Sequence, residues 1–250
     1  MFHSLIIAFS TYSKIPMPQA EWSEKNMRYS ICFFPLIGLI IGLLEWGALC
    51  LAAYLDFNPL LRAALLTVIP FLVTGGIHMD GFSDTSDARH SYRTREEKLE
   101  IMKDPHVGSF AVFCCVLYLL LYFSVLSEVR VSDAPALTGS FVISRILSGL
   151  AVTVFPKAKK DGMLRSTADA SAKSVKWILT VELVFTVILM TVLKPAAGGA
   201  AAAAALLFFM YYRHVSVREF GGITGDLAGW FLQMTELILT CVIVISGKVI

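Results

Sequence analysis

Residues 31–55 read ICFFPLIGLIIGLLEWGALCLAAYL, an apolar run that contains one charged residue, Glu45. A helix needs about 20 mainly apolar residues to cross the hydrocarbon core of a bilayer. Six further runs of this kind lie at residues 59–77, 110–127, 136–155, 175–193, 197–212 and 228–246. Because the 136–155 run contains Arg145 and the 197–212 run is short and rich in alanine, we expect six or seven spanning helices in total.

The composition of the whole chain supports the same interpretation. Of its 250 residues, 56% are hydrophobic and 16% are charged, whereas an average soluble domain has about 45–50% apolar and about 25% charged residues. The five cysteines lie inside apolar runs without the spacing of a zinc site. We therefore expect an all-α fold class: a polytopic transmembrane helical bundle, with residues 1–250 forming one integral membrane domain. Residues 2–13 should form an interfacial helix rather than a signal peptide.

The distribution of basic residues predicts how the bundle is oriented. A net charge of +2 does not indicate nucleic acid as a partner. Sixteen of the 21 Lys and Arg residues lie in the N-terminal region, in three long polar segments or, for Lys176, just after the second of these segments, and four lie in the opposite connections. By the positive-inside rule the basic side faces the cytoplasm. The three long segments are residues 78–109, 156–174 and 213–227.

The first of these segments begins with an acidic motif, GGIHMDGFSDTSD at residues 75–87. Asp80, Asp84 and Asp87 are separated by four and three residues, which places them on one face of a helix. Three carboxylates so close together repel one another unless a cation lies among them, and their hard oxygens suit magnesium or manganese. A solvated loop with capping aspartates is the simpler alternative. The motif begins with Gly75 and Gly76, and glycines let the backbone approach a ligand closely.

Other polar residues add candidate roles around this motif. His78 is a candidate acid or base, although a lone histidine is more often a hydrogen-bonding partner. In IMKDPHVG, at residues 101–108, Lys103 could neutralise phosphate and Asp104 could complete a metal site; a helix end with a proline stop is the alternative. Arg145 lies inside an apolar run, where a charge is costly in lipid, so it should face the protein interior.

A second glycine-rich segment, GGITGDLAG at residues 221–229, precedes the last apolar run. Backbone N–H groups at the start of a helix can bind phosphate, and Asp226 could add a metal ligand. The candidate phosphate-binding residues here are Gly221, Gly222, Thr224 and Gly225.

Together these segments resemble the cobalamin synthase family, the adenosylcobinamide-GDP ribazoletransferases. The matching segments occur in the family's order over nearly the whole chain. The chain departs from the pattern at residues 88–90, where glycine-rich sequence would be expected, and residues 156–162 match only loosely. The segments that carry the resemblance are TYSKIPMP at 11–18, FPLIGLIIG at 34–42, GGIHMDGFSDTSD at 75–87, IMKDPHVG at 101–108 and GGITGDLAG at 221–229.

The resemblance implies a magnesium-dependent transfer at phosphorus in the bacterial cytoplasmic (inner) membrane. A ribose hydroxyl of α-ribazole, or of its 5′-phosphate, would attack the phosphate attached to cobinamide in adenosylcobinamide-GDP. GMP would leave, and the product would be adenosylcobalamin or its phosphate. His78 would orient or deprotonate the hydroxyl, and Lys103 and Arg145 would offset phosphate charge at a site facing the cytoplasm. The sequence is compatible with a homo-oligomer. The implied magnesium ligands are Asp80, Asp84, Asp87, Asp104 and Asp226.

Two other functions remain open at this stage. A CDP-alcohol phosphotransferase-like membrane enzyme also places aspartates at helical spacing, but the later part of its motif is missing after Asp87-Ala88-Arg89. An ion or solute transporter could use ionisable residues inside the spans. Transporter sites lie near the bilayer midplane at broken helices, whereas the acidic segments here lie at the ends of apolar runs.

Overall fold

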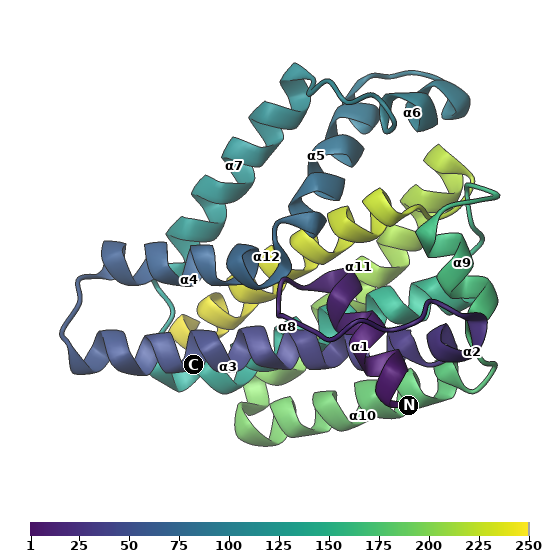
Figure 1. Ribbon diagram of the computed structural model, residues 1–250. Coiled ribbons are helices and arrows are strands. Elements are labelled where there is room, and N and C mark those ends of the chain that lie inside the picture. The colour runs from purple at the N-terminus through teal and green to yellow at the C-terminus, as the bar shows by residue number, and fades with distance from the viewer. Residues whose placement is uncertain (250) are drawn as a thin grey trace.

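The computed structural model describes residues 1–249 and shows a bundle of helices (Figure 1). Six helices are long and apolar enough to cross a membrane. The expected all-α, polytopic class is therefore confirmed. The six are α3 (Phe34–Tyr54), α7 (Ser109–Leu126), α8 (Ala134–Val154), α10 (Val175–Leu193), α11 (Pro195–Phe220) and α12 (Gly225–Val249).

The seventh expected span is broken. The 59–77 run forms α4 (Pro59–Thr74), and the chain then bends by 96° into α5 (Ile77–His90). Gly75 and Gly76 make the bend with φ angles of 67° and 79°, a conformation that glycine adopts without steric cost. The pair makes seven spans if it is counted as one. Since α5 is polar and carries three aspartates, we treat only α4 as part of the apolar layer.

The two runs that the sequence left uncertain as spanning helices both form long helices in the structure. The 136–155 run, despite Arg145, forms the unbroken helix α8, and 16 of its 21 residues are buried. The 197–212 run is not short in the structure, because α11 continues to Phe220 and so takes up much of the expected 213–227 loop. The count of six or seven holds, but its uncertainty comes from the glycine break after α4.

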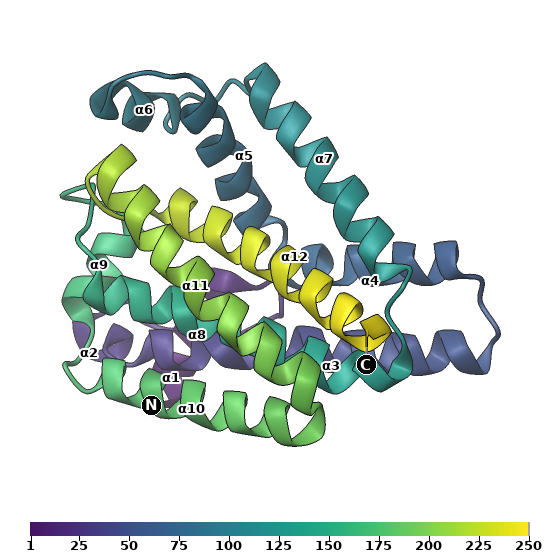
Figure 2. The ribbon, with the colours of Figure 1, turned by 180° about the vertical axis from the view of Figure 1, so that it is seen from behind.

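The other two long polar segments also contain helices. Residues 78–109 include α5 and α6 (Arg95–Ile101), and residues 156–174 include α9 (Met163–Ala170). A capping box begins α6: the Thr94 hydroxyl accepts from the Glu97 N–H at 3.4 Å, and the Glu97 carboxylate accepts from the Thr94 N–H at 2.9 Å. Such reciprocal bonds satisfy two backbone donors at a helix start. These helices lie together with the α11–α12 turn on one side of the bundle (Figures 1 and 2).

Close packing of α3 on α8 forms the centre of the bundle. Gly38 and Gly42 lie one turn apart on α3, and a Cβ atom at Gly38 would fall 2.3 Å from the carbonyl oxygen of Phe141. A Cβ atom at Gly42 would fall 2.5 Å from the Cα atom of Thr138. Small residues at this spacing let helix backbones approach closely in lipid, where dispersion forces rather than hydrophobicity hold helices together.

The N-terminal residues form short helices beside this core. The expected N-terminal helix is present as α1 (Phe2–Tyr12), and its middle residues are buried. The backbone N–H of Lys14 donates to the carbonyl of Val73 at 2.8 Å, which fixes the segment after α1 to the end of α4. The remaining short helices are α2 (Glu24–Met27), η1 (Ser30–Phe33) and η2 (Val131–Asp133).

Candidate active site

The candidate site is built where α5 crosses α12. A Cβ atom at Gly81 would lie 2.7 Å from the carbonyl oxygen of Asp226, and one at Gly229 would lie 2.8 Å from the carbonyl oxygen of His78. Each helix thus presents a glycine to the backbone of the other, and no side chain separates them at these points. This contact brings the first turn of α12 against the first turns of α5, although the two segments are far apart in the sequence.

Four carboxylates gather at the crossing, and we call Asp80, Asp84, Asp87 and Asp226 the acidic cluster. The pKa of Asp84 is raised from its usual value to about 6, first by partial burial and then by the negative charges of the other three. Lys159 acts in the opposite direction. The structure therefore places the aspartates of both motifs within electrostatic reach of one another.

Asp87 forms the edge of the cluster nearest α7. Both of its carboxylate oxygens lie so close to Gly108, the N-cap of α7, that a Cβ atom there would overlap them. A carboxylate is favoured at a helix N-terminus by the partial positive charge of the unpaired N–H groups. Gly108, the last residue of the IMKDPHVG segment, thus makes room for Asp87.

Lys159 is the basic residue that the sequence analysis missed. Its Nζ lies 3.5 Å from Oδ2 of Asp226. The segment that carries it pairs with the α11–α12 turn: the Ile223 N–H donates to the Pro156 carbonyl at 2.8 Å, and the Ala158 N–H donates to the Ile223 carbonyl at 3.0 Å. The available signal was the run of lysines in residues 156–162, a segment that matched the family pattern only loosely.

The two residues chosen from IMKDPHVG lie on the surface. Lys103 Nζ is 2.8 Å from Oε1 of Glu100, and Oδ1 of Asp104 accepts from the backbone N–H of His106 at 2.9 Å. Both side chains are exposed. The structure does not bring either residue into the acidic cluster, so a role for them at phosphate or metal stays a prediction.

Three of the candidate glycines are required by the backbone conformation or by close packing. Gly221 ends α11 with a φ of 79°, and a Cβ atom at Gly75 would overlap the side chain of Lys14. At Gly222 a Cβ atom would lie 2.6 Å from the carbonyl carbon of Lys157. These contacts explain glycine without a ligand, and phosphate binding by these residues remains untested.

The start of α12 is shaped differently. The buried Thr224 hydroxyl accepts from the Leu227 N–H at 3.1 Å and so caps the helix. Beyond it, a Cβ atom at Gly225 would meet no described atom within 4 Å. Gly225 is therefore the candidate glycine beside open space next to Asp226.

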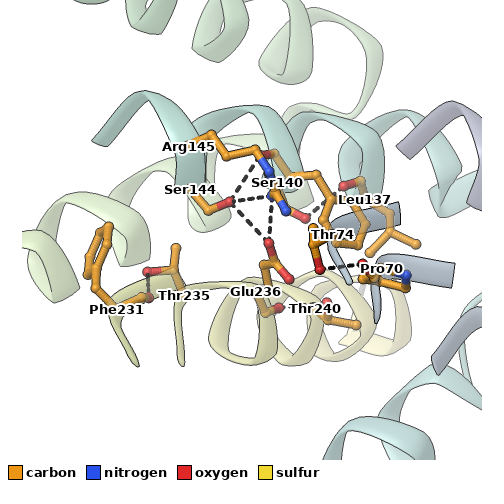
Figure 3. A network of polar contacts seen from close by, with 11 residues as sticks. Pro70, Thr74, Leu137, Ser140, Ser144, Arg145, Phe231, Thr235, Glu236 and Thr240 are labelled. Carbon is orange, nitrogen blue, oxygen red and sulfur yellow. Dashed lines mark hydrogen bonds and ion pairs between the residues drawn. The ribbon is translucent and has the colours of Figure 1, made fainter. Parts of the chain in front are cut away.

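Arg145 faces the protein interior, as its position in an apolar run predicted, and is 1% exposed. Its Nη1 is 2.6 Å from Oε1 of Glu236 and donates to the Phe141 carbonyl at 3.0 Å and the Ser144 hydroxyl at 3.1 Å (Figure 3). Its charge is therefore committed to Glu236 and joins α8 to α12. These contacts engage Nη1 alone, and a role for Arg145 at phosphate stays a prediction.

His78 contributes to a cavity beside the acidic cluster. The cavity has a volume of about 160 Å³ and lies among α1, η1, α3, α5, α8, α9 and α12. His78 is 6% exposed, and its ring centre is 5.7 Å from that of Phe34, which also lines the cavity. Asp80 and Asp226 stand in the same wall. We call this space the aromatic cavity; the two acids link it to the acidic cluster.

Residues 88–90, where the chain departs from the family pattern, include Arg89, whose side chain joins three helices. Arg89 on α5 forms an ion pair with Glu219 on α11 at 3.1 Å, and its guanidinium lies 4.9 Å from the ring centre of Trp230. Lys98 on α6 reaches the same Glu219 at 3.0 Å. These basic residues hold α5 and α6 against α11 and α12, which supports the helix crossing from outside the cluster.

The acidic cluster has the donor chemistry of a magnesium–phosphate site. Among residues 1–249, no three His, Cys, Asp or Glu side chains converge closely enough to bind a metal by themselves. Magnesium usually takes only one or two protein carboxylates and fills its shell with water and substrate phosphate. The partly buried carboxylate of Asp84 and those of its neighbours fit that requirement.

Comparisons with known proteins identify the same family as the sequence motifs. The family model for cobalamin-5-phosphate synthase matches residues 4–244. An adenosylcobinamide-GDP ribazoletransferase of Lachnoclostridium phytofermentans is 45% identical over 99% of this chain and 95% of its own length. Enzymes of the same name from Clostridium botulinum and Acinetobacter baumannii are 36% and 30% identical, over 95% and 97% of this chain and 95% and 96% of their own lengths.

No solved structure matches the chain significantly. The family and sequence matches give no support to the phosphotransferase and transporter alternatives. Since the family model covers nearly every residue and a close relative aligns from end to end, the chain belongs to the cobalamin-5-phosphate synthase family.

Proposed function

We propose that the chain is a membrane transferase that joins adenosylcobinamide-GDP to α-ribazole or its 5′-phosphate. The products are adenosylcobalamin, or its phosphate, and GMP. The observation that carries this proposal is the crossing of α5 and α12, which brings Asp226 and Asp80 to the wall of one cavity, within electrostatic reach of Asp84. The names of the relatives supply the substrates, and the chain's own residues supply the matching chemistry.

In this reaction the acceptor hydroxyl oxygen bonds to the cobinamide-linked phosphorus as the bond to the GMP oxygen breaks. Asp80, Asp84 and Asp226 would hold a magnesium ion, and such an ion would supply positive charge against the diphosphate. Lys159 offsets charge on the same side of the cluster, at 3.5 Å from Asp226. His78 in the cavity wall orients the acceptor hydroxyl by accepting its hydrogen bond. Burial and the nearby charge of Arg145 lower the pKa of His78 to about 3, so the imidazole stays neutral and the proton passes on to water or to the departing GMP phosphate.

The polar side of the bundle faces the cytoplasm in this proposal, and the membrane is the bacterial cytoplasmic membrane. Support comes from the basic residues, which concentrate in the polar segments. The helices of these segments, α5, α6 and α9, lie on one side of the bundle (Figure 1). A nucleotide-activated substrate made in the cytoplasm then reaches the site without crossing the bilayer.

The direct test is an assay of the purified, detergent-solubilised protein with adenosylcobinamide-GDP and α-ribazole, with and without magnesium. We expect a corrinoid product and GMP in equal amounts, and loss of both when EDTA removes the metal. If CDP-alcohols are consumed instead, or if GMP forms without a joined corrinoid, the proposed function is wrong.

A further inference from the structure

The walls of the aromatic cavity are mainly apolar away from the acidic cluster. Ile31, Phe34, Val152, Leu164 and Leu232 line it from five different elements. Such walls favour a planar, apolar group, because burying a polar group without a hydrogen-bond partner costs about 1–3 kcal/mol in proteins.

Apart from the imidazole of His78, the few polar side chains away from the acids carry hydroxyls. They belong to Tyr12 on α1, Ser148 on α8 and Thr167 on α9. Burial raises the pKa of Tyr12 to about 12, so this phenol stays neutral. The part of the cavity away from Asp80 and Asp226 thus holds neutral hydroxyls among hydrocarbon side chains and suits an uncharged ring.

The volume of the cavity selects among the chemical groups of the two substrates. At about 160 Å³ it is comparable to a protein cavity of about 150 Å³ that binds benzene, so it suits the apolar six-membered ring of a fused base, with the second ring toward the acids. A corrin macrocycle is far too large for this space. A guanine base is planar, but it presents amide and amine edges that need hydrogen-bond partners, and a mainly apolar wall leaves these unpaired.

We propose that the aromatic cavity binds the fused aromatic base of the acceptor nucleoside, and that Leu164 of α9 sets the size of base that fits. This inference rests on the proposed function and adds which substrate lies where. With the base between Phe34 and Leu164, the ribose of the acceptor lies toward Asp80 and Asp226. The donor diphosphate then approaches the acidic cluster from the open side, and the corrin ring stays outside the cavity.

Leu164→Trp tests the proposal by filling the cavity from α9. Its matched control is Ser166→Trp, which adds the same side chain to the same helix at an exposed position that does not line the cavity. We expect Leu164→Trp to raise the KM for α-ribazole by about tenfold or more, since one misplaced methylene in an apolar pocket is worth about 10–200-fold. The KM for adenosylcobinamide-GDP should change less than twofold, and Ser166→Trp should change neither.

A second variant keeps the proposal testable if Leu164→Trp misfolds. Leu164→Ala enlarges the cavity, so it should accept a nucleoside with a three-ring base that the unsubstituted protein rejects. The proposal is overturned if Leu164→Trp raises the KM for the donor instead, which would place guanine in the cavity. It is also overturned if both Leu164 variants behave like Ser166→Trp.

Binding without turnover separates this inference from the proposed function. Equilibrium dialysis of α-ribazole against the purified protein in EDTA should show saturable binding that Leu164→Trp weakens and Ser166→Trp preserves. If the protein binds the nucleoside in this way but transfers nothing, the proposed function fails and the cavity assignment stands. If the protein makes product but the dialysis shows no binding sensitive to Leu164, the cavity assignment fails alone.

Discussion

Replacing Gly81 by alanine should impair catalysis by separating α5 from α12. The added Cβ atom would lie 2.7 Å from the Asp226 carbonyl oxygen, whereas ordinary van der Waals contact begins at 3.4 Å. The helices must therefore move apart by roughly 0.7 Å, the difference between these two distances. A displacement of about 1 Å in a catalytic arrangement can cost about 100-fold in rate. We expect kcat/KM to fall by about this factor while the protein still inserts into the membrane.

Gly47→Ala is the matched control for this prediction. Gly47 lies within α3, and a Cβ atom there would meet no described atom within 4 Å. Its replacement should leave kcat/KM unchanged and stabilise the helix by about 0.5–1 kcal/mol. Steady-state kinetics in detergent and thermal unfolding give the two readouts. The reasoning is refuted if Gly81→Ala retains full activity, or if its loss of activity equals that of the control.

Four further outcomes follow from the arrangement of charges. Asp84→Asn should lower activity by orders of magnitude at unchanged extraction from membranes; full activity at limiting magnesium would remove Asp84 from the site. Lys159→Ala should raise the donor KM more than Lys103→Ala, and the reverse order would restore Lys103 as the phosphate partner. Glu236→Gln leaves a buried guanidinium without its carboxylate partner, so unfolding should become easier by about 3–5 kcal/mol, and an unchanged unfolding midpoint would contradict this. Ser83→Cys, with the five native cysteines replaced, should react with impermeant reagents only from the cytoplasmic side of sealed vesicles; labelling only from outside would reverse the orientation.

The fold class and the main helices follow from the sequence because lipid imposes a simple length and polarity rule. The spacing of Asp80, Asp84 and Asp87 indicated a helix, and α5 spans all three. The break after α4 was harder to predict. Gly75 and Gly76 are visible in the sequence, but the packing of Lys14 against Gly75 and its bond to Val73 depend on the folded chain.

The partners of the acidic cluster could be predicted only in part. Asp226 was associated with Asp84 because both occur in glycine-rich segments on one expected side of the membrane. Lys159 could not be distinguished from Lys103 in the same way, because its place depends on backbone bonds between Pro156 and Ile223. Such long-range pairing leaves no periodic pattern in the sequence, so local reasoning favoured the lysine of the more recognisable motif.

The most direct test of one shared site is a double-mutant cycle between Asp84 and Asp226. Residues that act as a unit give strongly non-additive losses. We predict that Asp84→Asn combined with Asp226→Asn lowers kcat/KM little more than the worse single substitution does. If the two losses multiply as they do for independent sites, the carboxylates do not serve one metal–diphosphate centre, and Asp226 acts only at the start of α12.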